Sequence, residues 1–408
     1  MTSPAPRPSI FASPAFRKYY AGQTLSYLGD GLRLISIPLL AYQITHSALS
    51  TGGAFICEIA PFSLFSLIGG SLADRLDRRK LMISADAVRF LVMAAIAIAY
   101  AFHVLTLPMI YCGLVVISTA AALFMGGQSS SIPFMLGRDR STEAIAMLIA
   151  AENLTSLVMP AAGAAVFAYF GPLPALTINA LTYLGSQISL ALIPTLGPDK
   201  SSGLPSIVQI GQDIALGYRH LWSDATMRIQ AVAGFAFNFF GFGAYAIIIP
   251  FLKRGFDASD QVVGIFLGLS ALGAVAGASF AARFSRRWPF GKALTTAYVL
   301  DALLFLPIVL FNNIWLCAAA WMASNTVANF EIAQIIGFRM RVSPPEAVGR
   351  VMGAVRLVVL AGMAPGVILL GWVSDHRSPH DAMWIACIGY IVIAVAALCL
   401  PTLRNELR

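Results

Sequence analysis

The sequence predicts an all-α integral membrane protein in which twelve transmembrane helices form two pseudo-symmetric six-helix halves. The first observation behind this prediction is the composition: 58% of the 408 residues are hydrophobic and only 11% are charged. Soluble proteins contain about 45–50% apolar and about 25% charged residues. The apolar stretches are long and do not alternate with polar residues as membrane β-strands do, so we expect helical spans.

The second observation is the number of apolar windows. A helix needs about twenty apolar residues to cross roughly 30 Å of hydrocarbon. Twelve such windows occur in the chain, with boundaries that are soft by several residues. The expected helices cover residues 18–43, 48–73, 81–103, 107–127, 145–170, 173–194, 229–252, 261–282, 292–311, 314–338, 351–373 and 382–401.

The third observation is an internal repeat. The segment GDGLRLISIP aligns with GFGAYAIIIP and shares its Gly-x-Gly and its closing Ile-Pro, and GGSLADRLDRR aligns with GASFAARFSRR. In each alignment a helix matches the one six spans later, so the two halves have the same orientation and are related by an axis along the membrane normal. The aligned ranges are 29–38 with 241–250, 69–79 with 277–287, and 143–163 with 346–366.

Basic residues predict how the chain is oriented in the membrane. If the N-terminus is cytoplasmic, 21 of the 27 Lys and Arg residues fall in the termini and inner loops, three in outer loops and three within spans. Cytoplasmic segments are enriched in Lys and Arg, so we expect both termini in the cytoplasm. This asymmetry explains the net charge of +8 and makes a nucleic-acid partner unnecessary.

A polar segment separates the two halves. Within it, Ile207, Ile210 and Ile214 recur at helical spacing in LPSIVQIGQDIALGYRHLW, which predicts an interfacial helix on the inner leaflet; an ordinary solvated linker is the alternative. The expected organisation is a cytoplasmic tail (1–17), an N-terminal six-helix bundle (18–194), a cytoplasmic linker with the interfacial helix (195–228), a C-terminal six-helix bundle (229–401) and a cytoplasmic tail (402–408).

The loop after the second span carries a recognisable motif. GGSLADRLDRRK, residues 69–80, resembles the signature loop G-x-L-A-D-R-x-G-R-R between helices 2 and 3 of the major facilitator superfamily. Asp77 stands where that signature has its second glycine. This variant, together with the first span SYLGDGLRLISIPLLAYQITHSALS, resembles the macrolide-efflux and enterobactin-exporter branch of proton-coupled antiporters. The matching residues are Gly70, Leu72, Ala73, Asp74, Arg75, Arg78 and Arg79.

The resemblance implies a cytoplasmic gate. In the family, the aspartate of this loop docks against the start of helix 11 and closes the inner side, and anions are favoured at such helix ends. Asp74 would then meet the start of the eleventh span near 349–351, held by Arg75 and Arg78. Ala282 occupies the equivalent place in the second half, so the gate is one-sided. Alternatively, Asp74 and Asp77 merely neutralise neighbouring arginines.

Charged side chains inside the spans are candidates for function because they are costly near the bilayer centre. Asp30 and Arg33 are three residues apart on one face of the first span, and Asp30 is the first choice for a protonatable carboxylate coupled to substrate. A permanent structural ion pair is the alternative. The full set is Asp30, Arg33, Glu58, Asp86, Arg89, Glu152, Asp301, Glu331 and Arg356.

The resemblance narrows this set. It implies that helices 1, 2, 4, 5, 7, 8, 10 and 11 line the central cavity, which favours Glu58, Glu152 and Glu331 beside Asp30 and disfavours Asp301 in helix 9. Asp86 and Arg89 are interpreted as a structural pair. Many drug–proton antiporters of the superfamily carry an arginine in helix 4, but this fourth span has no charged residue, so proton coupling would rest on the carboxylates.

Two further sets of residues were considered for the cavity. In the repeat, Phe242 and Tyr245 of helix 7 occupy the positions equivalent to Asp30 and Arg33, and Asn238 lies among the aromatic residues of that helix. Such aromatic residues more often serve packing than ligand binding. Glu152 aligns with Val355, next to Arg356, and opposite charges on these two helices could attract across the cavity.

These features together predict a secondary active transporter that expels amphipathic, drug-like small molecules in exchange for protons by alternating access. A siderophore exporter, an importing facilitator and a lipid-handling facilitator are alternatives. The chain lacks HExxH, G-x-S-x-G and Walker A motifs, which argues against an enzyme or an ATP-driven pump. We expect no cofactor or metal, and a monomer whose partners are a small-molecule substrate, protons and the lipid bilayer.

Overall fold

The computed structural model describes residues 10–73, 76–194, 196, 215–216, 218–219, 221–223, 225–284, 289–342 and 348–399. Within these residues the fold is helical and has no strands, as the sequence predicts. A short 3₁₀ helix, Ile10–Ala12, precedes the bundle. The long helices are α1 (Pro14–Thr45), α2 (Ala48–Ala73), α3 (Arg78–Ala101), α4 (Leu107–Leu136), α5 (Arg138–Phe170), α6 (Pro172–Ala191), α8 (Ala225–Phe256), α9 (Asp260–Phe284), α10 (Phe290–Leu310), α11 (Ile314–Val342), α12 (Val348–His376) and α13 (Pro379–Cys399).

Local sequence signals explain several helix ends. The Ser13 side chain accepts a hydrogen bond from the Phe16 amide at the start of α1, and the Asp77 carboxylate caps the start of α3. These are residues that favour helix N-termini. Gly137 and Gly171 adopt φ values of +79° and +81° between α4, α5 and α6, a backbone conformation that side chains disfavour. The chain can therefore turn directly from one helix into the next.

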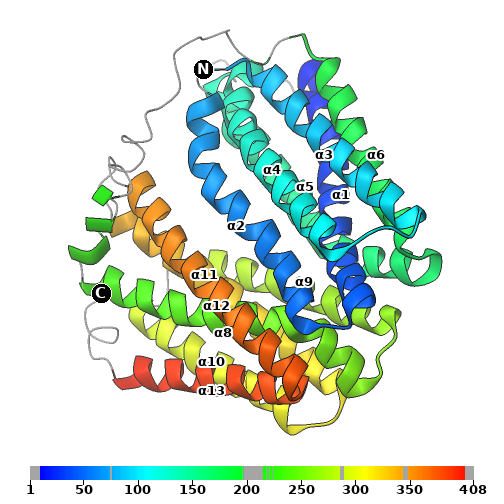
Figure 1. The fold of residues 1–408 in the computed structure, drawn as a ribbon. Coiled ribbons are helices and arrows are strands. Elements are labelled where there is room, and N and C mark those ends of the chain that lie inside the picture. The colour runs from blue at the N-terminus through cyan, green and yellow to red at the C-terminus, as the bar shows by residue number, and fades with distance from the viewer. Residues whose placement is uncertain are drawn as a thin grey trace.

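The predicted division into two six-helix halves matches the arrangement of the helices (Figure 1). Helices α1–α6 pack mainly with one another, and α8–α13 do the same. The repeat holds at the level of helix ends: when Gly29 is placed on Gly241, α1 and α8 end within one residue of each other. Pro38 and Pro250 then occupy the same position near the end of each helix.

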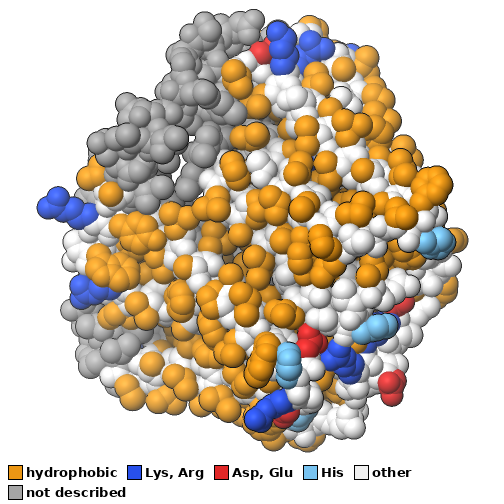
Figure 2. Space-filling view, viewed as in Figure 1, with side chains coloured by type: hydrophobic (Ala, Val, Ile, Leu, Met, Phe, Trp, Pro, Cys, Tyr) orange, Lys and Arg blue, Asp and Glu red, His pale blue; other side chains and the backbone are white. Residues whose placement is uncertain are grey.

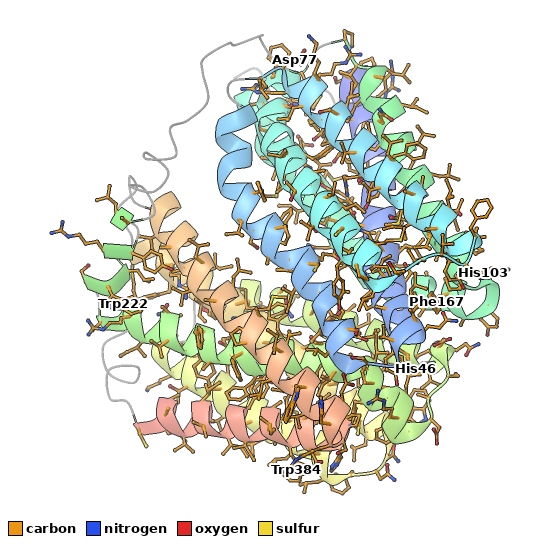
Figure 3. All side chains as sticks on the ribbon, in the orientation of Figure 1. His46, Asp77, His103, Phe167, Trp222 and Trp384 are labelled. Carbon is orange, nitrogen blue, oxygen red and sulfur yellow. The ribbon has the colours of Figure 1, made fainter. Side chains whose placement is uncertain are left out.

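The two ends of the bundle differ. Figure 3 labels His46, His103 and Trp384 at one end, and Asp77 and Trp222 at the other. We call these the His46 end and the termini end, because α1, the first long helix, begins at the second and α13, the last helix, ends there (Figure 1). Helices α2 and α12 approach each other near the His46 end and diverge toward the termini end. The two halves thus meet most closely at the His46 end.

Close packing closes the His46 end. A Cβ atom added to Gly52 of α2 would come within 2.4 Å of Val367 Cγ1 in α12. A Cβ added to Gly371 of α12 would come within 2.9 Å of the Leu49 Cα in α2. Real Cβ atoms are not found that close to other atoms, so glycine is required for this approach of the two helices. Helix α5 packs against α9 as the second contact between the halves.

The outer surface suits a lipid environment. Apolar side chains cover most of the face in Figure 2, and the charged side chains gather toward the two ends of the bundle. Seven of the helices that the structure describes are long and apolar enough to cross a membrane. Large exposed apolar side chains such as Leu91, Ile98 and Val392 are therefore expected to face lipid rather than water.

Some predicted features lie outside the described residues. They include Asp74 and Arg75 of the expected cytoplasmic gate, most of the expected interfacial helix at 204–222, residues 1–9 of the expected N-terminal tail, and the C-terminal tail at 402–408. The rest of the expected N-terminal tail is largely helical, because the 3₁₀ helix begins at Ile10 and α1 begins at Pro14. The start of α12, which Asp74 was expected to meet, is described only from Val348 and without its first side chains. The gate therefore stays a prediction.

Candidate functional site

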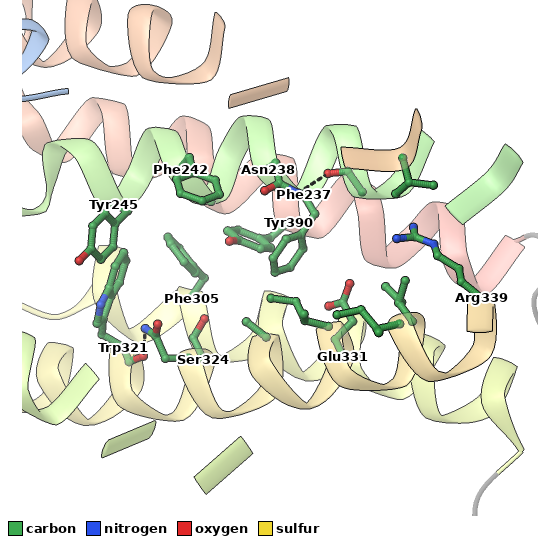
Figure 4. Close-up of a pocket in the computed structure, with 18 of the residues that line it drawn as sticks. Phe237, Asn238, Phe242, Tyr245, Phe305, Trp321, Ser324, Glu331, Arg339 and Tyr390 are labelled. Atoms are coloured by element: carbon green, nitrogen blue, oxygen red, sulfur yellow. Dashed lines mark hydrogen bonds between the residues drawn. The ribbon is translucent and has the colours of Figure 1, made fainter. Parts of the chain in front are cut away.

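A cavity of about 750 Å³ lies between the two halves. This volume is in the range of sites for drug-sized molecules. Helices α8, α10, α11 and α13 provide most of its wall, and Ser66 of α2 and Met125 of α4 complete it from the first half. In the close-up of Figure 4, Tyr245 and Trp321 lie at one end of the row of lining residues and Arg339 at the other. The lining includes Phe237, Asn238, Phe242, Tyr245, Phe305, Trp321, Ser324, Asn325, Glu331, Arg339 and Tyr390.

Aromatic packing shapes this wall. The Tyr390 ring stacks on Phe305 with centroids 4.6 Å apart and meets Phe237 edge-on at 5.3 Å. The Trp321 indole donates to the Ser270 hydroxyl at 3.2 Å, which fixes its ring between α9 and α10. The amide nitrogen of Asn238 donates a hydrogen bond to the Gly234 carbonyl at 2.7 Å. This bond does not use the amide oxygen of Asn238. The cavity wall is therefore largely aromatic and carries few polar groups.

Two buried carboxylic acids lie at this wall. Glu331 of α11 lines the cavity and is 2% exposed, and Asp301 of α10 is completely buried. The Ser324 hydroxyl donates a hydrogen bond to Asp301. One oxygen of each carboxyl group has no hydrogen-bond partner among the described residues. Among the described residues of the second half, these are the two acidic side chains that are buried within the helices.

The surroundings of Glu331 and Asp301 contain little positive charge. No described Lys, Arg or His nitrogen lies within 4.0 Å of either carboxyl group. Arg339 follows eight residues later on α11 and lines the cavity beyond that distance. The phenols of Tyr298 and Tyr390 are the other titratable groups beside them. A buried carboxylate without a paired cation is costly, and binding a proton removes that cost.

The acidic residues of the first half are placed differently. The Asp30 carboxylate is 3.2 Å from Arg33 Nη2, and the Arg33 Nη1 is 2.7 Å from the Glu58 carboxylate. Arg33 is only 5% exposed. Its Nε also donates to the Tyr183 hydroxyl at 3.1 Å, and that hydroxyl donates to Asp30 at 2.7 Å. The pair that sequence spacing predicts on α1 is thus formed and extends to α2 and α6.

Arg89 of α3 joins the same group. Its Nη2 lies 2.6 Å from Asp30, and its Nη1 lies 3.0 Å from Asp86 and donates to the Ser26 hydroxyl. The guanidinium also stands over the Tyr183 ring, 4.0 Å from its centroid. The Asp86–Arg89 pair predicted from sequence is real, but it is part of a larger network that includes Asp30. We call the set Asp30, Arg33, Glu58, Asp86, Arg89 and Tyr183 the first-half ion network.

Sequence analysis did not find the link between Arg89 and Asp30 or the role of Tyr183. Both depend on which faces of α3 and α6 turn toward α1, and helical spacing within one span does not reveal that. A weak signal was available, since Arg89 is one of three basic residues within the expected spans. A buried cation requires a nearby acid, and in the sequence Asp86, three residues before Arg89, already meets this requirement.

The other predicted site residues are less central. Glu152 of α5 is exposed and forms no ion pair with a described residue. Phe242 and Tyr245 are half-buried and line the cavity, as proposed from the repeat. Arg79 of the predicted gate donates to the carbonyls of Leu190 and Ala191 at the end of α6. The side chains of Asp74, Arg75 and Arg356 lie outside the described parts, and Gly70 is near the end of α2.

A family model for transmembrane secretion effectors of the major facilitator superfamily matches residues 5–406. The chain belongs to this family. It is therefore a multi-pass membrane transporter and not an enzyme, as the resemblance of the loop at 69–80 implied. The motif, the repeat and the helix order all agree with this membership.

Relatives of this transporter include named exporters. It is 25% identical over 392 residues to the multidrug efflux pump Tap of Mycolicibacterium fortuitum, which covers 92% of this chain and 93% of that protein. It is 21% identical over 402 residues to the enterobactin exporter EntS of Citrobacter koseri, covering 97% and 93%. Both matches extend over almost the whole of each chain.

Solved structures agree on the fold. A bacterial homologue of the human lysosomal transporter Spinster, in an inward-facing and unoccupied conformation, superposes with a TM-score of 0.74 at 13% identity over 98% of this chain and 99% of that one. The nucleoside transporter NupG gives a TM-score of 0.76 at 13% identity over 94% and 98%. At this identity the likeness concerns the fold alone.

Proposed function

We propose that this transporter exports amphipathic, drug-like small molecules across a bacterial inner membrane in exchange for protons. The distribution of basic residues along the sequence supports a cytoplasmic termini end. With that orientation the His46 end is the closed outer side, and the structure corresponds to an inward-facing state. Export would then proceed as the halves rock about the cavity, closing the termini end and opening the His46 end.

One observation carries the coupling proposal: Glu331 reaches the cavity and is buried there with no paired cation among the residues that the structure describes. Such a group is most stable when it binds a proton or a cationic ligand. Asp301 lies close behind it on α10, with its own hydrogen bond from Ser324. We assign Glu331 as the carboxyl group that exchanges the proton, and Asp301 as a second protonatable group that supports it.

The first-half ion network is assigned a structural role. Asp30 is contacted by two guanidinium groups and by Tyr183. Protonating it would break several of these contacts and leave Arg89 and Arg33 with less compensation, which is unfavourable at a buried site. Of the two interpretations left open for Asp30, the geometry thus favours the permanent ion pair.

The cavity suggests what is carried. Its wall is mainly aromatic and aliphatic, with Glu331 and Asn238 as polar groups on the wall and Arg339 near the termini end. An apolar molecule with a basic nitrogen fits this chemistry, since aromatic faces and a carboxylate both attract cations. The similarity to the multidrug efflux pump Tap supports the export of drug-like molecules. A catecholate siderophore is the second candidate, favoured by the similarity to EntS and by the positive charge of Arg339.

Accumulation of labelled compounds tests the proposal. Efflux-deficient cells with and without the transporter are loaded with cationic dyes, macrolides and a catecholate siderophore, before and after a protonophore. We expect the transporter to lower the accumulation of at least one cationic amphiphile, and the protonophore to restore it. Selective depletion of the siderophore would favour the second candidate. A lowered accumulation that the protonophore leaves unchanged would contradict proton coupling.

A further inference from the structure

An acidic side chain of the second half binds the start of a first-half helix at the His46 end. Asp375, in the last turn of α12, accepts a hydrogen bond from the Ser47 hydroxyl at 2.6 Å. It also accepts bonds from the backbone amides of Ala48 at 2.7 Å and Leu49 at 3.1 Å. These amides belong to the first two residues of α2, where backbone N–H groups have no hydrogen-bond acceptor within the helix. A residue more than 300 positions away in the sequence thus serves as the N-terminal cap of α2.

A basic side chain of the second half binds the same corner. Arg254, near the end of α8, is 3.4 Å from Asp375. It donates to the His46 carbonyl and, at 3.2 Å, to the Tyr42 hydroxyl, both at the end of α1. It also donates to the Ser374 carbonyl at 3.3 Å. Arg254 and Asp375 together therefore hold the turn between α1 and α2.

Electrostatics strengthens this contact. The N-terminus of a helix carries partial positive charge and attracts an anion. Partial burial alone would raise the pKa of Asp375, but the hydrogen bonds from Ser47, Ala48 and Leu49 and the charge of Arg254 outweigh it and lower that pKa. The group is 18% exposed and lies two residues beyond the expected eleventh span. It is therefore ionised under physiological conditions and remains available to water when the contact breaks.

We infer that Asp375 and Arg254 form the latch that holds the His46 end of the transporter closed. Every first-half partner in the latch lies in the turn or at the adjoining helix ends, so opening this end must break all of these contacts together. The close approach of Gly371 to Leu49 lies one turn further into the same helix pair. Latch and packing thus act on one contact between α2 and α12.

This latch is a different device from the gate predicted at residues 69–80. In that gate, the loop after the second span is expected to meet the start of the eleventh span, which is α12, at the termini end. Here, the end of α12 caps the start of α2 at the opposite end. The inference rests on the alternating access of the proposed function, but it needs no knowledge of the substrate or the coupling ion.

Labelling from the outside tests the latch without transport. All five native cysteines (Cys57, Cys112, Cys317, Cys387 and Cys399) are replaced, and a single reporter cysteine is placed in the cavity by Asn238→Cys. Intact cells are exposed to a membrane-impermeant maleimide. Asp375→Asn weakens the latch, and we expect the labelling rate of the reporter to rise about fivefold, since a charge at a helix terminus shifts an equilibrium by roughly that factor.

A matched control lies on the same face of the second half. Lys253 of α8 pairs with Asp260 of α9, and neither contacts the first half through this pair. Asp260→Asn therefore removes an ion pair of the same kind but should leave the labelling rate unchanged. Equal rates for Asp375→Asn and the parent protein, or an equal rise for Asp260→Asn, would overturn the latch.

A disulfide tests the same contact in the other direction, and it also decides the matter if Asp375→Asn does not fold. Ser47→Cys with Asp375→Cys places two thiols where a hydrogen bond now joins the side chains. We expect oxidation to cross-link them and abolish outside labelling of the reporter, and dithiothreitol to restore it. A cross-linked protein that is still labelled from outside at the parent rate would exclude closure at this point.

This outcome is distinguishable from failure of the proposed function. If no compound in the accumulation panel is exported, the labelling experiment still reports whether the His46 end opens. If the labelling is insensitive to Asp375→Asn while export is intact, the latch is wrong and the transporter assignment stands.

Discussion

The two halves of this transporter differ in the partners that surround their buried acidic residues. In the first half, Asp30, Glu58 and Asp86 are each within 3.2 Å of a guanidinium group. In the second half, Asp301 and Glu331 are equally buried, but no described cation lies within 4.0 Å of either carboxyl group, and Asp301 accepts a hydrogen bond from the Ser324 hydroxyl. The two halves therefore share the same arrangement of helices, but the buried acids of the first half are paired with cations and those of the second half are not paired with a described cation.

The difference has a physical consequence. A buried ion pair is strongly destabilised when one partner is removed, because the other charge is left uncompensated. A buried acid without a cation is relieved when it is neutralised. The first half is therefore expected to hold its charges constant through the transport cycle, whereas the second half can change protonation with little structural loss.

Removing a guanidinium from the first-half ion network should have the largest effect. Arg89→Leu leaves Asp30 with Arg33 as its only cation and Asp86 with none among the described residues. We expect the free energy of unfolding to fall by about 3–5 kcal/mol, seen as a lower unfolding temperature in detergent and poor recovery of the folded protein.

Asp301→Asn is the counterpart of Arg89→Leu in the second half. It removes a charge that has no described ion-pair partner, and asparagine can still accept the bond from Ser324. We expect its unfolding temperature to equal or exceed that of the parent protein. Similar destabilisation by both variants would remove the distinction between the halves.

The latch provides a smaller effect that depends on pH. Because the pKa of Asp375 is lowered in the folded protein, the stability it contributes is complete above the ordinary aspartate pKa of about 3.9. It is lost as the pH falls through the lowered folded value. We expect the difference in unfolding temperature between the parent protein and Asp375→Asn to be constant from pH 8 to pH 5 and to shrink below about pH 4.

The titratable side chains that face Asp375 are few. Arg254 of α8 lies 3.4 Å from Asp375, and His46 and His376 are the sequence neighbours of Ser47 and Asp375. Histidines normally titrate above pH 5, so a change confined to lower pH reports the carboxylate. A difference that vanishes between pH 5 and pH 7 would point to a histidine instead of Asp375.

Most of the fold could be predicted from the sequence. The spans follow from apolar length alone, and the two halves follow from a repeat that preserves Gly29 and Pro38 in α8 as Gly241 and Pro250. These signals are local, because hydrocarbon thickness fixes helix length and a duplicated segment keeps its spacing. The Asp30–Arg33 pair was predictable for the same reason, being three residues apart on one helix.

The parts that escaped prediction depend on contacts between helices. Asp30 meets Arg89 of α3 and Tyr183 of α6, and which faces of these helices meet is set by packing of the whole bundle. The family resemblance disfavours Asp301 as a site residue, because it places the ninth span outside the cavity. In the structure, however, Asp301 accepts a hydrogen bond from Ser324, which lines the cavity. Asp375 fell in a short loop between spans, where a single acidic residue carries no sequence signal.

The most direct test compares Glu331→Gln with Glu58→Gln in proteoliposomes. The two variants make the same chemical change, once at an acid without a described cation and once at an acid 2.7 Å from Arg33. A cationic dye that the parent protein exports is followed down its own gradient and against it with an imposed pH gradient. We expect Glu331→Gln to keep downhill movement and lose the response to pH, and Glu58→Gln to keep both with a lower unfolding temperature. A full response to pH in Glu331→Gln would contradict Glu331 as the site of the coupling proton, and a loss of that response only in Glu58→Gln would place the proton in the first half.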